Sequence, residues 1–129
     1  MPYNILIVDD SETVRAVIAR TLEMAGVDIR NLHHAENGEV ALGILRDEWI
    51  DLVFTDINMP VMTGVEMISK MQEDELMSTV PVVVVSTEGS KTRIEDLMNK
   101  GVRAYIRKPF TPEKVKEIID ELLQGKRDE

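Results

Sequence analysis

Short apolar segments that alternate with helical patterns constrain the fold of this chain more than any other feature. Four of these segments are rich in β-branched residues and contain no regular polar alternation, so both faces of each predicted strand are expected to be buried. They span Ile5–Val8, Leu52–Thr55, Val82–Val85 and Ala104–Ile106. A fifth segment, Ile29–Leu32, is more polar and therefore suits the edge of a sheet.

A pattern typical of an amphipathic helix follows each of these segments. The first helix is expected to end at Gly26, the second to begin near Asn37, and the third to follow Gly64. The fourth stops at Gly101, and the last opens at Thr111–Pro112, with the threonine as N-cap. This order predicts an α/β fold, in which five βα units form a doubly wound parallel sheet with helices on both faces.

The length of 129 residues favours a single domain over residues 1–129, with a core of about 4–124 and a frayed tail at 125–129. The formal charge of −9 argues against nucleic-acid binding, because contacts to phosphates require a cationic surface. Cysteine is absent, which excludes disulfides and a thiol nucleophile. No apolar run approaches the ~20 residues that cross a bilayer. We therefore expect a cytoplasmic protein without membrane insertion.

The charge is unevenly distributed along the chain. Residues 91–116 hold 8 of the 15 Lys and Arg residues but only 3 acidic residues. This window covers the predicted fourth helix, the last strand and the start of the last helix. The sequence therefore predicts a basic surface on an otherwise acidic protein.

Polar side chains follow four of the predicted strands. They are Asp9 and Asp10 after the first strand, Asp56 after the third, Ser86 and Thr87 after the fourth, and Lys108 after the fifth. The carboxyl ends of parallel strands lie at one edge of a sheet, where ligands of doubly wound folds bind. These side chains are therefore expected to converge.

Three neighbouring carboxylates repel one another unless a cation compensates them. Mg²⁺ is the expected cation for such a group, because it is coordinated by one or two carboxylates and also coordinates phosphoryl oxygens. A magnesium site beside a free carboxylate and a lysine is suited to phosphoryl transfer, with the carboxylate as nucleophile.

The ordered set Asp9-Asp10, Asp56, Ser86 and Lys108-Pro109 resembles the response regulator receiver domain of two-component signalling, from Ile5 to about Leu123. The resemblance implies a flavodoxin-like, CheY-like fold with the strand order 2-1-3-4-5. It also implies a signalling switch that catalyses its own aspartyl phosphorylation and dephosphorylation. A sensor histidine kinase or phosphotransfer protein would donate the phosphoryl group to Asp56, with Mg²⁺ as cofactor.

The resemblance assigns roles within the site. Mg²⁺ would be held by Asp9, Asp10, Asp56 and the backbone carbonyl of Asn58, with Asp9 acting largely through water. Lys108 would pair with Asp56 before phosphorylation and with a phosphoryl oxygen afterwards. Plainer interpretations remain open: Asp56 as a turn residue, Asp9 and Asp10 as charges at a helix N-terminus, and Lys108 as a solvated side chain.

The resemblance also implies a switch. Ser86 would donate a hydrogen bond to the phosphoryl group, and the ring of Tyr105 would move into the space that Ser86 leaves; a half-buried strand tyrosine is the plainer alternative. Asn58, Thr87 and Glu88 would set the lifetime of the phosphoryl group. The target-binding surface of the fourth helix, fifth strand and fifth helix would include Lys91, Ile94, Arg103, Tyr105 and Ile118.

Among stand-alone receivers, the chemotaxis type is most similar, although Ile118 stands where a lysine is found in its best-known members. A phosphorelay shuttle or adaptor receiver is an alternative within the family. A phosphatase of the haloacid dehalogenase type is an alternative from another class, because it also uses an aspartyl nucleophile with Mg²⁺. Its nucleophile lies in a D-x-D motif after the first strand, whereas Asp9 is followed by Asp10-Ser11.

Overall fold

Five parallel strands form a single sheet in the order β2-β1-β3-β4-β5, which confirms the predicted topology. The computed structural model of the chain describes residues 2–86, 91–108 and 110–124. The strands span Tyr3–Val8 (β1), Ile29–Ala35 (β2), Leu52–Thr55 (β3), Val82–Ser86 (β4) and Ala104–Arg107 (β5). β2 lies at the edge, as its polar sequence predicts. It runs three residues beyond its predicted end, because an edge strand tolerates polar side chains.

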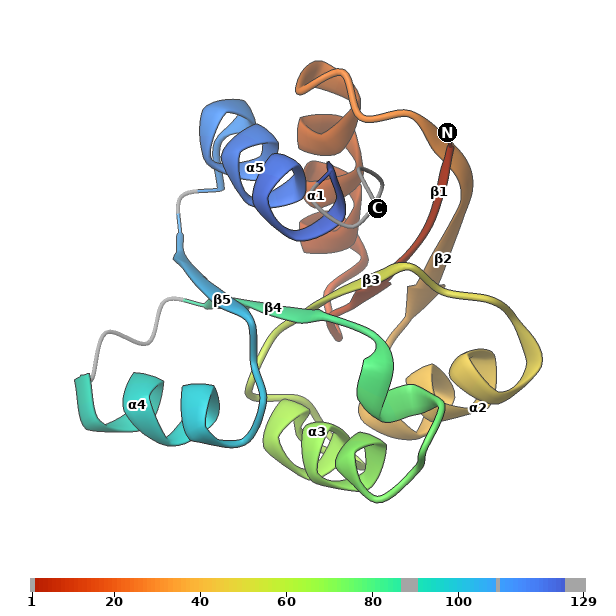
Figure 1. Ribbon diagram of the computed structural model, residues 1–129, viewed down its shortest axis with the longest axis vertical. Helices are drawn as coiled ribbons and strands as arrows, with labels where there is room; N and C mark the ends of the chain where they lie inside the picture. The colour runs from red at the N-terminus through yellow and green to blue at the C-terminus, as the bar shows by residue number, and fades with distance from the viewer. Residues whose placement is uncertain (1, 87–90, 109, 125–129) are drawn as a thin grey trace.

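The helices form two layers around this sheet (Figure 1). One layer contains α1 (Glu12–Met24) and α5 (Pro112–Ile119), and a π-helical turn, η2 (Asp120–Gln124), follows α5. The opposite layer contains α2 (Gly38–Asp47), α3 (Gly64–Gln72) and α4 (Lys91–Asn99), with a short 3₁₀ turn, η1 (Met77–Thr79), before β4. The α/β, doubly wound prediction is therefore confirmed.

The sheet separates two apolar cores, because successive side chains of a strand point to opposite faces. Phe54 and Val83 pack with α1 and α5, whereas Val53 and Val84 pack with α2, α3 and α4. The central strands β1, β3 and β4 are therefore buried on both faces, as their unbroken apolar sequences predict.

Ile118 lies in the core on the α1 side and is only 9% exposed. It shares the apolar stripe of α5 with Val115 and Ile119, which face the sheet and α1. The prediction that Ile118 belongs to an exposed target-binding surface is therefore wrong, because the helix needs this side chain to hold it against the sheet.

Side-chain caps determine where the helices begin. The hydroxyl oxygens of Ser11 and Thr111 accept hydrogen bonds from the third residue beyond them, at the starts of α1 and α5. Thr63 forms a capping box with Glu66 at the start of α3. Because these caps directly follow the loops after β1, β3 and β5, they also position the strand-end residues.

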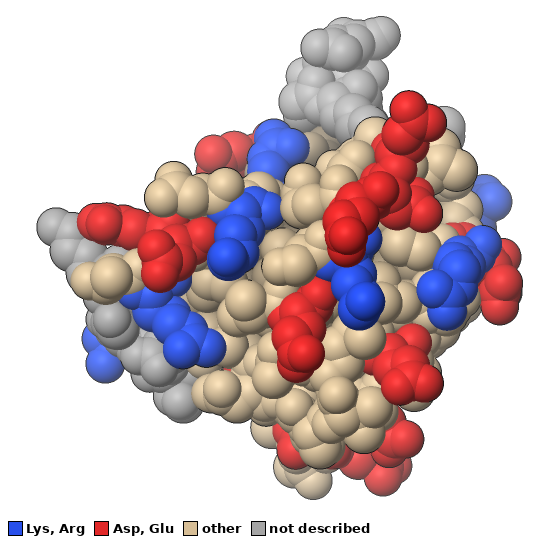
Figure 2. All heavy atoms as spheres, turned by 90° about the horizontal axis from the view of Figure 1, so that it is seen from below, with Lys and Arg blue, Asp and Glu red and all other residues tan. Residues whose placement is uncertain are grey.

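Charged side chains of both signs are intermixed on the part of the α2, α3 and α4 face that the structure describes (Figure 2). No extended basic patch is visible over the described residues of this face. Among the described helices, none is long and apolar enough to cross a membrane.

Candidate functional site

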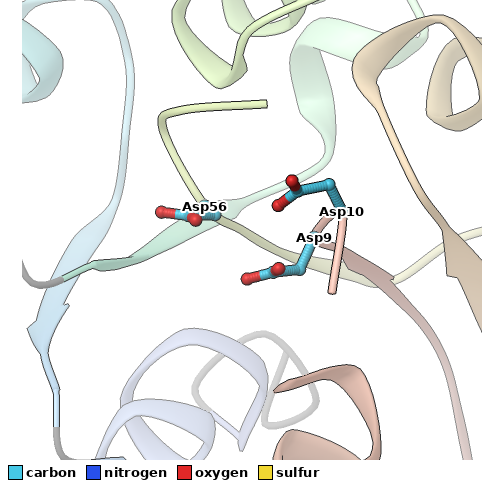
Figure 3. A group of neighbouring side chains, drawn as sticks. All are labelled: Asp9, Asp10 and Asp56. Atoms are coloured by element: carbon cyan, nitrogen blue, oxygen red, sulfur yellow. The ribbon is translucent and has the colours of Figure 1, made fainter. Parts of the chain in front are cut away.

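Two neighbouring strands bring three carboxylates together at the carboxyl edge of the sheet. β1 ends at Val8 and β3 ends at Thr55, and these two residues lie opposite each other in the parallel register. The backbone N–H of Asp56 then donates to the carbonyl of Val8 over 3.0 Å. As a result, one carboxylate oxygen from each of Asp9, Asp10 and Asp56 lies within 4.8 Å of the others (Figure 3). The predicted convergence of these side chains is present.

Asp9 is the buried member of this group, with only 2% of its surface exposed. Burial raises the pKa of its carboxyl group, and the nearby charges of Asp56 and Asp10 add to the effect. The backbone N–H of Ser11 opposes it by donating to Asp9 Oδ1 over 2.9 Å, as does the Lys108 ammonium. The site therefore holds more negative charge than its own donors compensate.

Lys108 reaches this cluster from the end of β5. Its Nζ atom lies 3.9 Å from Asp9 Oδ2, and its backbone N–H donates to the carbonyl of Ser86 over 2.9 Å. Within the described part of the chain, this is the ion pair that Lys108 forms; the expected pair with Asp56 is not present. Asp9 is the more buried carboxylate, so the ammonium compensates the charge that water reaches least.

Asp56 is half-buried at the mouth of the site. Its Oδ1 atom accepts a hydrogen bond from the backbone N–H of Ile57 over 2.8 Å. Its Oδ2 atom has no hydrogen-bond donor among the described residues. One carboxylate oxygen is therefore anchored while the other is available to react.

The loop from β3 to α3 passes so close to Asp56 that it requires a glycine. The backbone N–H of Gly64 donates to the carbonyl of Ile57 over 2.8 Å. A Cβ atom at Gly64 would lie 2.2 Å from the carbonyl oxygen of Asp56, which is far inside van der Waals contact. In the same loop, Val61 has a φ of 68°, a strained conformation for a β-branched residue.

The structure places two further predicted residues near this edge. Ser86 ends β4 and is 2% exposed, and its backbone carbonyl accepts the hydrogen bond from the backbone N–H of Lys108. Tyr105 lies in β5 opposite Val84 and packs, half-buried, against the core on the α4 side. Both residues therefore lie on the strands that lead to the acidic cluster.

The remaining predicted residues are less completely described. Asn58 is exposed in the loop after β3, Arg103 is exposed before β5, and Ile94 is half-buried on α4. Thr87 and Glu88 lie outside the described residues, as does the side chain of Lys91.

Arg15 was not among the site residues predicted from the sequence, yet its side chain binds the backbone of the site. From the second turn of α1, its Nη1 atom donates to the backbone carbonyl of Asp9 over 2.5 Å. Its Nε atom is buried and has no hydrogen-bond partner in the described structure. The sequence does contain a signal for this contact. Arg15 lies four residues after the N-cap Ser11, and residues at this spacing share one face of a helix, so Arg15 faces the same strand end as Ser11.

His34, near the end of β2, is exposed. Loss of hydration next to its neighbours still lowers its pKa, as does the nearby charge of Arg15, while Glu12 opposes the shift. The folded protein thus favours neutral His34, so its stability should fall as pH drops below the ordinary value of 6.5. We expect His34→Gln to lose less thermal stability than the unmodified protein between neutral pH and about pH 5.5. His33→Gln is the matched control on the same strand. Equal losses in His34→Gln and the unmodified protein would contradict this interpretation.

The three carboxylates fit Mg²⁺ in donor chemistry. Oxygen ligands are what this ion prefers, and the raised pKa of buried Asp9 marks a charge that a cation would stabilise. Two of the carboxylates are accessible to solvent, which suits an ion that keeps several waters.

Asp9→Asn is expected to raise the stability of the metal-free protein while it weakens the binding of Mg²⁺. The raised pKa means that ionised Asp9 costs stability at neutral pH, a cost that disappears as pH falls through the folded-state pKa. The asparagine removes this charge but can still accept from Ser11, so the melting temperature in EDTA should rise. The further increase caused by Mg²⁺ should shrink or vanish. Asp28→Asn, at an exposed position, serves as control, and an undiminished Mg²⁺ effect in Asp9→Asn would contradict the prediction.

The family model of the response regulator receiver domain matches residues 5–120. A chemotaxis protein CheY homolog from Campylobacter jejuni is 38% identical, over 93% of this chain and 92% of its own. The chemotaxis protein CheY of Pseudomonas aeruginosa is 36% identical, over 94% and 96%. The solved structure of Vibrio cholerae CheY4 superposes with a TM-score of 0.83 at 28% identity, over 95% of this chain and all of its own.

Proposed function

The chain belongs to the response regulator receiver domain family, and from that premise we propose that it is a switch controlled by phosphorylation of Asp56. The observation that carries the proposal is the Asp9, Asp10 and Asp56 cluster, with the Lys108 ammonium beside it. Receiver domains act in signalling and not as metabolic enzymes, and their phosphoryl group comes from a histidine kinase. The catalysis of this domain is therefore directed at its own aspartate.

Asp9, Asp10 and Asp56, together with the carbonyl of Asn58, are the residues we propose to hold Mg²⁺. The bound ion would supply positive charge to the transferring phosphoryl group. Arg15 binds the backbone carbonyl of Asp9 and the N–H of Ser11 binds its carboxylate, so these two groups orient Asp9 within the cluster.

The proposed chemistry is displacement at phosphorus. Asp56 Oδ2 attacks the phosphorus of a phosphohistidine, the new P–O bond forms, and the P–N bond breaks. The imidazole leaves and takes up a proton. Lys108 then turns from Asp9 to a phosphoryl oxygen, a short movement because the ammonium already lies at the cluster.

We propose that the response passes through β4 and β5. Ser86 and Lys108 are joined through their backbones, so a new hydrogen bond from the Ser86 hydroxyl would act directly on the end of β5. Tyr105 lies in β5 and packs against the core on the α4 side, and it is the proposed switch aromatic. Lys91, Ile94 and Arg103 are the proposed partners of a target protein on the surface formed by α4 and β5.

Chemotaxis is the pathway that the similarity favours, since the relatives described above are chemotaxis proteins; a phosphorelay shuttle or adaptor remains the second candidate. The phosphatase alternative is not favoured. In that class the nucleophile follows the first strand in a D-x-D motif, whereas here the available carboxylate oxygen belongs to Asp56, after β3.

A phosphorus NMR experiment tests the switch against the phosphatase. With Mg²⁺ and phosphoramidate, a small P–N phosphodonor, we expect an acyl phosphate signal equal to one group per chain, followed by slow release of phosphate. EDTA should prevent both. Rapid and continuous hydrolysis of an aryl phosphate would favour the phosphatase, and a signal of unchanged size in EDTA would contradict the role of the metal.

Asn58 and Glu88 are expected to set the lifetime of the acyl phosphate, because they match the two sequence positions that flank the phosphoryl group in the receiver family. Replacing each with alanine or lysine changes how water reaches the phosphorus atom. The loss of phosphoryl groups after removal of the donor should then differ from that of the unmodified protein. Unchanged decay in both sets of variants would rule out this role.

A further inference from the structure

A groove with exposed apolar walls lies at the amino edge of the sheet, opposite the acidic cluster. It has a volume of about 310 Å³ and is formed by the loop between α2 and β3 and by the segment around η1. Its lining includes the buried residues Ile50 and Met77. Trp49 and Leu76 line it and are 71% and 79% exposed. Two such large apolar side chains at one groove are unusual for a surface with no partner.

Hydrogen bonds hold Trp49 in place despite its exposure. Its indole N–H donates to Asp51 Oδ1 over 3.0 Å, and Asp51 Oδ2 accepts from the backbone N–H of Asn4 over 2.8 Å. The indole is thereby connected to the start of β1. A side chain that is already ordered loses less entropy when a partner covers it, which favours binding.

Leu76 is held in a similar way. The Oδ1 atom of Asp74 accepts from the backbone N–H groups of Leu76 and Met77, over 2.9 and 3.0 Å. The turn that carries Leu76 is thus fixed by its own carboxylate. Both exposed apolar residues therefore occupy defined positions in the lining of the groove.

The charges around the groove indicate the chemistry of its partner. Its lining includes three acidic residues and one basic residue, which are Asp47, Glu48, Asp51 and Arg46. Asp74 and Glu75 directly precede Leu76 and add two more carboxylates at that wall. A segment rich in Lys or Arg would be attracted to this rim, while an acidic segment would be repelled.

We propose that this groove docks a peptide segment of a partner protein in which an apolar side chain is flanked by Lys or Arg residues. The apolar side chain would lie between Trp49 and Leu76, and the basic residues would face the acidic rim. The groove lies at the amino ends of β3 and β4, whereas Asp56 and Ser86 lie at or beyond their carboxyl ends. Docking is therefore independent of phosphorylation and would tether the domain whether the switch is on or off.

Trp49 is the only tryptophan, so its fluorescence reports on this groove directly. The probe is a seven-residue synthetic peptide in which Lys alternates with Leu, titrated into the 129-residue protein. A matched peptide carries Glu in place of Lys. We expect a blue shift with the Lys peptide that weakens with salt, and none with the Glu peptide. The same result is expected in Asp56→Asn, so failure of the phosphorylation account would leave this proposal intact.

Two variants test the location. Leu76→Ser removes one apolar wall and Glu48→Lys reverses one rim charge, and each should weaken binding by roughly tenfold or more. Met24→Ser, which removes an exposed apolar side chain from α1, should leave binding unchanged. The proposal is overturned if the Lys peptide causes no shift, if both peptides bind alike, or if Leu76→Ser binds as tightly as the unmodified protein.

Discussion

Asp56→Asn is expected to abolish phosphoryl uptake entirely. The substitution replaces the reactive carboxylate oxygen with an amide while preserving the size of the side chain. The Ile57 N–H can still donate to the remaining oxygen, so the loop should keep its conformation. Radiolabelled phosphoramidate provides the measurement, with label retained on the protein as the readout.

Asp28→Asn is the matched control for this experiment, because it makes the same chemical change at an exposed residue far from the cluster. The control should take up label as the unmodified protein does. If Asp56→Asn retains label to a similar extent, the phosphoryl group is attached elsewhere and the assignment of Asp56 fails.

Gly64→Ala is expected to damage stability and phosphorylation together. The new methyl group would lie 2.2 Å from the Asp56 carbonyl, so either α3 or the Asp56 backbone must move. Overpacking against backbone should cost roughly 2 kcal/mol or more in the free energy of unfolding. Because the displaced residue is the proposed phosphoacceptor, the rate of phosphorylation should fall well beyond what the loss of folded protein explains. Denaturant unfolding and a labelling time course measure the two effects.

Gly43→Ala is the internal control. Gly43 lies within α2, and a Cβ atom there would meet no described atom within 4 Å apart from the adjacent residues and the backbone of its own helix. Alanine favours a helix over glycine by about 1 kcal/mol, so this variant should be slightly more stable than the parent. It should also be phosphorylated normally. A Gly64→Ala variant that matched Gly43→Ala in both measurements would show that the close approach at Asp56 is unimportant.

The fold could be predicted from sequence because local patterns and global topology agree. The unbroken apolar segments of β1, β3 and β4 require cover on both faces, and the structure provides it. The extension of β2 through His33 and His34 was missed, because alternation at an edge strand is a weak signal. The misplacement of Ile118 has a different cause: similarity suggested a surface position, while the periodicity of α5 already placed it in the core.

The strand-end residues of the site could be predicted because a parallel sheet brings the ends of β1, β3, β4 and β5 to one edge. The contacts between particular pairs of residues within the site could not be predicted from the sequence. The contact of Lys108 with Asp9, and not with Asp56, depends on which carboxylate is more buried. The hydrogen bond from Arg15 to the Asp9 carbonyl depends on how α1 sits against β1. Both are consequences of tertiary packing, which no local pattern encodes.

Intact-mass measurement of the unmodified protein tests the central claim most directly. With a small phosphodonor and Mg²⁺, the account predicts a single adduct of about 80 Da, the mass of one phosphoryl group. The adduct should map to Asp56 and should be absent when EDTA replaces Mg²⁺. A protein that gains no mass under these conditions, or gains it equally in EDTA, would contradict the account.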